Sequence, residues 1–229
     1  MRVIDNEKLN EGNCKITFIR IDPEDKKETL KKIFENIESL GWINEKIPEY
    51  LKPSYIAKAE PTISKLEELL EKRKNDELTS EIGEYFVSEI SRETIINELK
   101  YKDIPLSEIW KEKVSGNPGF DYHSQNNEHI IIFGEAKYLS NKNAYKSALK
   151  QIVEFIDLEK DIKELSELNE FVSKESIVNA NRGKKGYAIG FSAQKTKTKN
   201  LINHIKKDDC FNMLKQYEEI VIVAVNVYG

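Results

Sequence analysis

Residues 119–140 read GFDYHSQNNEHIIIFGEAKYLS, and their pattern predicts two neighbouring strands joined by a short polar turn. The first strand is expected over 120–123, and residues 125–127 supply the turn. The second strand is expected over 128–138. Its apolar run at 130–133 indicates that the strand is buried as it reaches Gly134. The stretch therefore predicts a hairpin at the centre of a folded domain.

The second strand ends in two charged side chains. Glu135 and Lys137 are two residues apart, so on a strand both point to the same face. An unpartnered charge beside a core costs free energy, so each of them needs a partner. The spacing itself is common in this chain, because Glu24 and Lys26 repeat it in a charged helical stretch. One alternative therefore stays open, in which Glu135 pairs with a nearby lysine and Lys137 extends into solvent.

Asp121 places a second carboxylate near the first. With the turn close to 126–127, Asp121 falls on the neighbouring strand, level with the end of the apolar strand to within a residue or two. Two converging carboxylates suit Mg²⁺ or Mn²⁺, and the backbone carbonyl of Ala136 offers a third oxygen. Lys137 would orient a water molecule or stabilise charge on a phosphate. These residues predict a metal-assisted centre for phosphodiester hydrolysis.

The rest of the chain predicts an α/β (α+β) fold with a mixed central sheet flanked by helices. We expect residues 77–229 to form the core and residues 1–76 to form an N-terminal strand and helix extension that docks a partner. An Asp22-Pro23-Glu24 start and Gly41 are expected to bound the first helix. The other expected elements are strands at 14–21, 186–191 and 220–225, helices at 61–74, 77–99, 142–158 and 197–216, an irregular proline-containing connector (Pro48, Pro53, Pro61) and a turn at 116–119.

Composition bounds the class of protein. The 229 residues are 33% charged and 39% hydrophobic, with a formal net charge of −4, as expected for a soluble globular protein. Cys14 and Cys210 lack metal-ligand spacing, which indicates free thiols in a reducing compartment. No apolar run approaches the roughly 20 residues that cross a bilayer, so we expect a cytoplasmic protein. The sequence also lacks nucleotide-binding loops and nucleophile-elbow motifs, which argues against an NTPase, dehydrogenase or acyl hydrolase.

Positive charge is concentrated after residue 175. No acidic residue occurs from 176 to 207, whereas basic residues gather before the strand expected at 186 and before the helix expected at 197. We expect this region to contact nucleic-acid phosphates. The alternative is an ordinary solvated run of charge. The candidate nucleic-acid-binding residues are Arg182, Lys184, Lys185, Lys195, Lys197 and Lys199.

Asp121, followed after thirteen residues by Glu135-Ala136-Lys137 at a strand end and then by a helix, resembles the PD-(D/E)xK, or restriction-endonuclease-like, nuclease superfamily. Phe120 stands where the motif's name has proline, a position that is commonly replaced. The resemblance covers residues 77–225. It implies a restriction-endonuclease-like fold and a metal-dependent nuclease in which Asp121 and Glu135 hold the cation and Lys137 assists the attacking water.

The superfamily also implies a glutamate on the helix before the hairpin. Glu84 is the candidate for a catalytic and metal-binding role, and Glu81 and Glu89 compete with it; helical counting places Glu89 nearer the apolar face. A polar residue on the following helix is implied as well, which Gln151 matches. His123, two residues beyond Asp121, is a further auxiliary candidate.

A narrower likeness joins the Gly83-Glu84 helix, the Gly119-Phe120-Asp121 turn and the Phe133-to-Lys137 segment behind an N-terminal extension. These features are similar to the nuclease subunits (HamA) of Hachiman-type antiphage defence systems. That likeness implies DNA as substrate and a helicase partner that restrains the nuclease; a restriction-type or repair nuclease stays open. From a different class, a non-catalytic nucleic-acid-binding or interaction subunit also remains an alternative.

Overall fold

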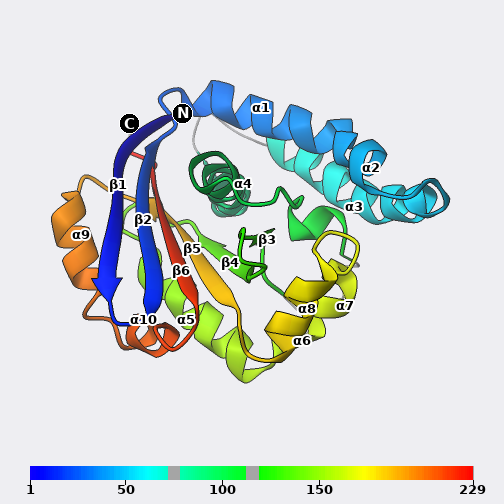
Figure 1. Ribbon diagram of the computed structural model, residues 1–229. Helices are drawn as coiled ribbons and strands as arrows, with labels where there is room; N and C mark the ends of the chain where they lie inside the picture. The colour runs from blue at the N-terminus through cyan, green and yellow to red at the C-terminus, as the bar shows by residue number, and fades with distance from the viewer. Residues whose placement is uncertain (72–77, 112–118, 229) are drawn as a thin grey trace.

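The computed structural model describes residues 1–71, 78–111 and 119–228, and a six-stranded sheet forms its centre (Figure 1). The strand order is β1-β2-β6-β5-β4-β3. Pairing is antiparallel at the two edges and parallel between β2, β6, β5 and β4. The strands are β1 (Arg2–Glu11), β2 (Cys14–Asp22), β3 (Tyr122–Gln125), β4 (Ile131–Lys137), β5 (Gly186–Ala193) and β6 (Glu219–Asn226). The mixed α/β architecture is confirmed, and the N-terminal strands belong to the same sheet as the hairpin.

Helices cover both faces of this sheet. α4 lies against one face with α1 to α3 outside it, while α5, α9 and α10 lie on the other side (Figure 1). The helices are α1 (Lys26–Ser39), α2 (Gly41–Lys46), α3 (Lys52–Glu71), α4 (Ser80–Leu99), α5 (Tyr145–Asp157), α6 (Lys160–Lys163), α7 (Leu165–Leu168), α8 (Lys174–Asn181), α9 (Thr198–Ile205) and α10 (Asp209–Leu214), with 3₁₀ turns η1 (Glu49–Leu51) and η2 (Ser107–Ile109).

β6 forms the middle of the core. All of its residues are buried, because helices cover both faces and β2 and β5 pair with both edges. This explains the unbroken run of β-branched and small apolar residues at 220–225, which is typical of a central parallel strand. The predicted strand there is confirmed.

α4 approaches the sheet closely because glycines lie at the contact. A Cβ atom on Gly83 would come within 2.3 Å of the Tyr138 ring, and one on Gly190 of β5 would come within 2.3 Å of the Ser91 hydroxyl. The Thr79 side chain caps the helix by accepting a hydrogen bond from the Ile82 N–H. This close packing brings the first turns of α4 beside the end of β4.

The sequence pattern did not predict β1. Its residues are mostly polar and exposed, so they carry none of the apolar alternation that indicates a half-buried strand. The strand forms because it pairs with β2 along its length, and its charged residues suit an edge strand.

The predicted boundaries of the first helix are wrong by a few residues. Asp25, not Asp22, caps α1 and accepts a hydrogen bond from the Glu28 N–H at 2.9 Å. At the other end Leu40 adopts the left-handed conformation that closes α1, and Gly41 begins α2. Local capping preferences therefore identified a helix but not its ends.

α3 extends the helix expected at 61–74 back to Lys52, so most of the proline-containing segment expected to be an irregular connector is helical, while Pro48 precedes η1. Pro53 lies in the first turn of α3, where the missing N–H removes no intrahelical hydrogen bond, but Pro61 lies inside the helix. Tyr55, Ala59, Thr62 and Leu66 are all buried and recur at helical spacing. Packing of this face compensates for the hydrogen bond that Pro61 cannot make.

Three further comparisons between prediction and structure concern the second half of the chain. The helix expected at 197–216 is divided into α9 and α10, because Asp208 caps a new helix by accepting from the Cys210 N–H at 3.0 Å. α8, capped by Ser173, was not predicted. The turn expected at 116–119 falls outside the described residues except for Gly119.

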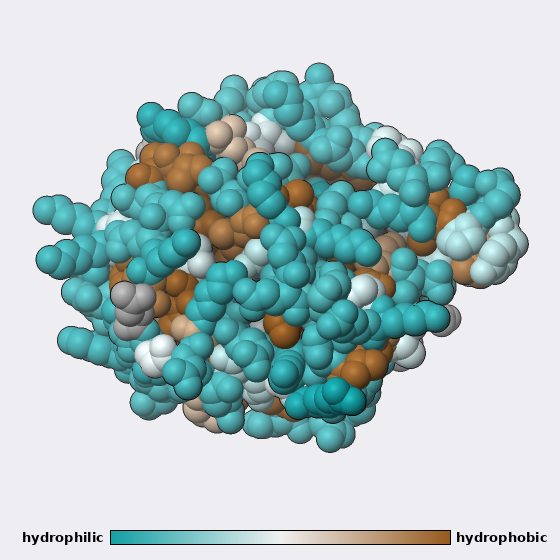
Figure 2. Space-filling model, in the orientation of Figure 1, coloured by the Kyte–Doolittle hydropathy of each residue, from teal (hydrophilic) through white to brown (hydrophobic). Residues whose placement is uncertain are grey.

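Figure 2 shows hydrophilic side chains over most of one face, broken by small apolar areas. Both cysteines are free thiols, Cys14 buried and Cys210 partly exposed. Within the described ranges, no helix has the length and apolar character needed to cross a bilayer.

Candidate metal centre

Asp121 lies directly before β3 and is level with the end of β4. Its backbone N–H donates to the Gly134 carbonyl at 2.9 Å, and its carboxylate Oδ2 accepts from the Ala136 N–H at 2.8 Å. Tyr122 pairs with Gly134, so Asp121 stands across from Glu135. The predicted hairpin is confirmed, with Asp121 level with the end of β4, although β3 begins two residues later than the strand expected at 120–123.

The Ala136 carbonyl faces the same side as the Asp121 carboxylate. In an extended strand, the N–H and C=O of one residue point to the same edge. The Ala136 N–H points toward Asp121, so its carbonyl points to that edge too. β3 begins only at Tyr122, so no β3 residue pairs with Ala136. The carbonyl is therefore placed as the sequence analysis expected.

Glu135 is a buried carboxylate whose nearest charged partner is Lys137. Its side chain is 0% exposed, and the Lys137 Nζ lies 2.9 Å from Oε1 as an ion pair. Apart from this Lys137 contact, neither oxygen accepts a hydrogen bond from any described residue. A buried carboxylate with a single ammonium contact for its two oxygens is costly, because it has given up its hydration.

The charges of this cluster shift one another. Burial raises the pKa of Asp121 to about 7, although Lys137 and the Ala136 N–H act in the opposite direction. Burial and then repulsion by Asp121 raise the pKa of Glu135 well above its ordinary value. Burial alone would lower the pKa of Lys137, but attraction to Glu135 and Asp121 raises it. Two carboxylates and one ammonium therefore share a single poorly hydrated site.

The donor set fits a hard divalent cation. The Glu135 oxygens, the Asp121 carboxylate and the Ala136 carbonyl are the oxygen ligands that Mg²⁺ and Mn²⁺ prefer. Among the described residues, no group of three His, Cys, Asp or Glu side chains already forms a metal-binding cluster. One or two protein carboxylates completed by waters are the usual ligands of Mg²⁺ in proteins.

Glu84 completes one side of the cluster from α4. Its Oε1 lies 3.7 Å from the Lys137 Nζ, and its side chain is 43% exposed. It also lines a cavity of about 110 Å³ together with Asp121, Glu81, Glu108, Tyr85 and Lys65. A cavity of this size holds several water molecules. Glu84 therefore lies beside the predicted centre and facing water.

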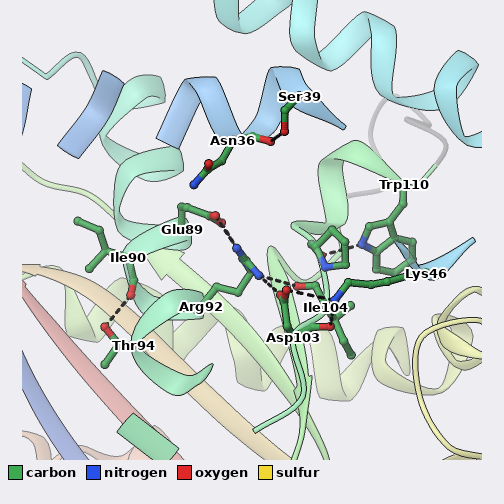
Figure 3. Close-up of polar contacts among 11 residues, drawn as sticks. Asn36, Ser39, Lys46, Glu89, Ile90, Arg92, Thr94, Asp103, Ile104 and Trp110 are labelled. Carbon is green, nitrogen blue, oxygen red and sulfur yellow. Dashed lines mark hydrogen bonds and ion pairs between the residues drawn. The ribbon is translucent and has the colours of Figure 1, made fainter. Parts of the chain in front are cut away.

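The two competing glutamates have other partners. Glu81 pairs with Lys65 of α3 at 3.2 Å and is 57% exposed. Glu89 is buried and accepts from the Arg92 Nε and Nη2 at 2.7 and 2.6 Å (Figure 3). Arg92 also binds Asp103, which pairs with Lys46 of α2, so Glu89 belongs to a network that joins α4 to the N-terminal helices.

His123, the further auxiliary candidate, points away from the centre. Its ring is fully buried, with Nδ1 3.0 Å from the Ser107 hydroxyl and Nε2 2.8 Å from Glu164. Burial and nearby Lys111 lower its pKa to about 4, so the ring is neutral. Gln151 lies on α5 and makes no hydrogen bond to the described residues of the centre.

The basic residues divide between the two ends of β5. Lys137 is opposite Phe191 and Ile132 is opposite Gly186, so β5 runs in the same direction as β4. Lys195, Lys197 and Lys199 are exposed and follow β5 at the same end as the centre. Buried Arg20 holds their loop by donating to the Gln194 and Thr196 carbonyls at 2.9 and 2.6 Å.

The other basic residues precede β5, at the far end of the sheet. Arg182 and Lys184 are exposed there. The expectation that Lys185 binds nucleic acid is wrong, because its side chain is only 9% exposed and forms an ion pair with buried Asp161. The intervening strand segment has six residues, from 132 to 137, and is about 17 Å long.

Sequence analysis missed three residues that line the cavity. Lys65 lies in the helix expected at 61–74 but was missed because local pattern does not show which side chain of that helix faces the cavity, and Glu108 because it lies in a segment without periodicity. Tyr85, which donates to Glu108, was assigned only to the apolar face of its helix. The signal available for Tyr85 was its position directly after the candidate Glu84 in the sequence.

The chain was also compared with known proteins. No family model and no curated protein matched its sequence.

Proposed function

We propose that the protein is a metal-dependent nuclease that hydrolyses phosphodiester bonds of DNA at the cluster of Asp121, Glu135 and Lys137. The observation that carries the proposal is the Glu135 carboxylate, which is fully buried near the carboxylate of Asp121 and contacts only the Lys137 ammonium among the described residues. A hard cation at these oxygens supplies Lewis-acid stabilisation of charge on a phosphate.

The residues of the chain divide the remaining work. Asp121, Glu135 and the Ala136 carbonyl form the oxygen-donor set, and Glu84 faces the cavity from α4 as an auxiliary ligand. Lys137, charged at neutral pH because its pKa is raised, orients the attacking water and stabilises negative charge that develops on the phosphate. Lys195, Lys197 and Lys199 lie at the same end of the sheet and contact the DNA backbone.

Cleavage of plasmid, linear and single-stranded DNA with Mg²⁺ or EDTA tests the proposal. Lys137→Met should lower the Mg²⁺-dependent rate by about 100-fold or more. Lys185→Met is the matched control, since Lys185, directly before the neighbouring strand β5, is also a lysine paired with a buried carboxylate, Asp161 of α6, and it should keep cleavage in its folded fraction. Full activity in Lys137→Met would refute the proposal.

A non-catalytic nucleic-acid-binding subunit is the second candidate. The observation in its favour is the ion pair between Glu135 and Lys137 at 2.9 Å, which gives the buried carboxylate a structural partner. Calorimetric titration with Mn²⁺ distinguishes the two candidate functions even if the isolated chain does not cleave DNA. The nuclease binds Mn²⁺ and loses that binding in Asp121→Asn, whereas the alternative binds DNA without binding Mn²⁺ at Asp121.

We extend the proposal to antiphage defence with a helicase partner, in line with the resemblance to Hachiman-type nuclease subunits. The N-terminal helices lie outside α4, and Tyr50 beside α3 is 81% exposed, which suits a docking surface. Glu135→Gln should abolish protection against phage without preventing co-purification of a helicase. Protection that persists in this variant would contradict the defence role of the centre.

A further inference from the structure

We propose that Glu164 is a positioning residue that holds Asp121 in place through a buried network, an inference that rests on the proposed metal centre. Glu164 lies between α6 and α7 and is 6% exposed. It is more than forty positions from Asp121 in the sequence and takes no part in the centre itself. Its two carboxylate oxygens bind residues on both sides of Asp121.

The first oxygen fixes the residue before Asp121. Glu164 Oε1 accepts from the Phe120 N–H at 3.0 Å and lies 2.8 Å from the Lys111 Nζ. Lys111 in turn donates to the Phe120 carbonyl at 3.2 Å. Both backbone polar groups of Phe120 are therefore held by this buried ion pair.

The second oxygen fixes the residues after Asp121. Glu164 Oε2 lies 2.8 Å from His123 Nε2; because an ionised carboxylate only accepts, Nε2 carries the proton. His123 Nδ1 then accepts from the Ser107 hydroxyl at 3.0 Å. The Ser107 backbone N–H donates to the Asp121 carbonyl at 2.9 Å, which returns the network to Asp121.

Burial excludes a catalytic triad at this position. Ser107, His123 and Glu164 have the order of a Ser-His-acid triad. Ser107 is 2% exposed and His123 is 0% exposed, so a substrate does not reach the hydroxyl. What the network does hold is the backbone from 120 to 123.

Gly119 shows how closely the network packs. A Cβ atom at this position would lie 2.0 Å from Glu164 Oε1, so any side chain would displace the carboxylate. The backbone before Asp121 is thus fitted directly onto Glu164. Displacing Glu164 frees Phe120 and His123 together, and with them the Asp121 carboxylate that accepts from the Ala136 N–H.

Glu164→Gln tests the inference, with Asp161→Asn as the matched control. Asp161 is also a buried acid of this segment with a buried lysine partner, but it binds Lys185 and Tyr187 instead of the backbone around Asp121. Two quantities are measured on each folded variant. One is the affinity for Mn²⁺ by calorimetry; the other is the exchange rate of the Ala136 amide by NMR in metal-free protein.

Glu164→Gln should weaken Mn²⁺ binding by about 10- to 100-fold, as for other residues that orient metal ligands. It should also speed Ala136 exchange, whereas Asp161→Asn should change neither quantity. Equal effects of the two substitutions would mean that Glu164 only stabilises the fold, and the inference would be overturned. If wild-type protein fails to bind Mn²⁺ but Ala136 exchange still rises only in Glu164→Gln, the proposed function fails and the positioning role stands.

Ser107→Ala provides a second, milder variant if Glu164→Gln does not fold. It removes the hydroxyl that His123 accepts from but keeps the backbone bond to Asp121. It should change both quantities in the same direction by a few-fold. No change in either quantity would then overturn the inference.

Discussion

Glu135 differs from an ordinary strand carboxylate in being fully buried with the Lys137 ammonium as its single contact for two oxygens among the described residues. The Lys137 ammonium balances its charge but leaves its second oxygen without a partner. Such a group destabilises the metal-free fold, and it persists where function requires it. We therefore expect Glu135 to lower the stability of the metal-free protein and to contribute to metal binding.

Glu135→Gln should abolish cleavage and still stabilise the metal-free protein. The neutral amide removes a buried charge, and Lys137 keeps Glu84 as a partner, so the free energy of unfolding at pH 8 should rise by about 1–3 kcal/mol. Denaturant titration measures the change. Asp161→Asn is the control and should be destabilising, because Asp161 accepts from the Tyr187 hydroxyl at 2.6 Å. A loss of stability in Glu135→Gln comparable to the control's would contradict this view of Glu135.

The raised pKa of Asp121, about 7, predicts opposite effects of pH on stability and on metal binding. A carboxyl group whose pKa is higher in the folded than in the unfolded protein binds its proton more tightly when folded, so its contribution to stability is present at low pH and is lost as pH rises through about 7. The melting temperature of the metal-free protein should thus fall between pH 5 and pH 8, while Mn²⁺ affinity rises. Asp121→Asn should flatten the decrease measured by calorimetry; an unchanged slope would argue against Asp121 as its source.

Individual elements differed in how well sequence could predict them. The β3–β4 hairpin joins residues within twenty positions, and the apolar run of β4 fixes its direction, so Asp121, Glu135 and Lys137 were placed from sequence alone. The first half of α3, before the helix expected at 61–74, was missed because its packing outweighs the local effect of Pro61. The contacts of Glu164 and Lys65 depend on tertiary packing between distant segments, which local patterns do not encode.

α3 contributes Lys65 to the acid-lined cavity, which predicts a role in substrate binding. Its ammonium pairs with Glu81 at 3.2 Å. Because the Lys65 side chain is 45% exposed, the ammonium can also contact a phosphate at the rim of the cavity. Lys65→Ala should weaken DNA binding several-fold and reduce the slope of log affinity against log salt by about 1, without changing Mn²⁺ affinity. Lys58→Ala, on the same helix with its ammonium over the Tyr55 ring, is the control. Identical salt slopes for both variants would contradict a phosphate contact at Lys65.

At the scale of the whole molecule, the parallel strands give the sheet two unlike ends. The centre and the Lys195–Lys199 loop share the carboxyl end of β4 and β5, whereas Arg182 and Lys184 lie at the opposite end. Sequence predicted one basic region because the residues are close along the chain. The structure separates these residues because Arg182 and Lys184 precede β5, whereas Lys195, Lys197 and Lys199 follow it.

Combined replacement of Lys195, Lys197 and Lys199 by alanine should therefore impair cleavage far more than replacement of Arg182 and Lys184. Each lost phosphate contact lowers the salt dependence of DNA binding by about one unit of slope. Binding isotherms at several salt concentrations, together with cleavage rates, measure both effects. Greater loss in the Arg182 and Lys184 variant would place the DNA at the other end of the sheet.

The most direct test of the metal centre is an anomalous difference map from crystals grown with Mn²⁺. We predict one peak at bonding distance, about 2 Å, from the carboxylates of Asp121 and Glu135 and from the Ala136 carbonyl. The peak should disappear in Asp121→Asn crystals. A wild-type map with no peak at these three oxygens at saturating Mn²⁺ would contradict the metal centre.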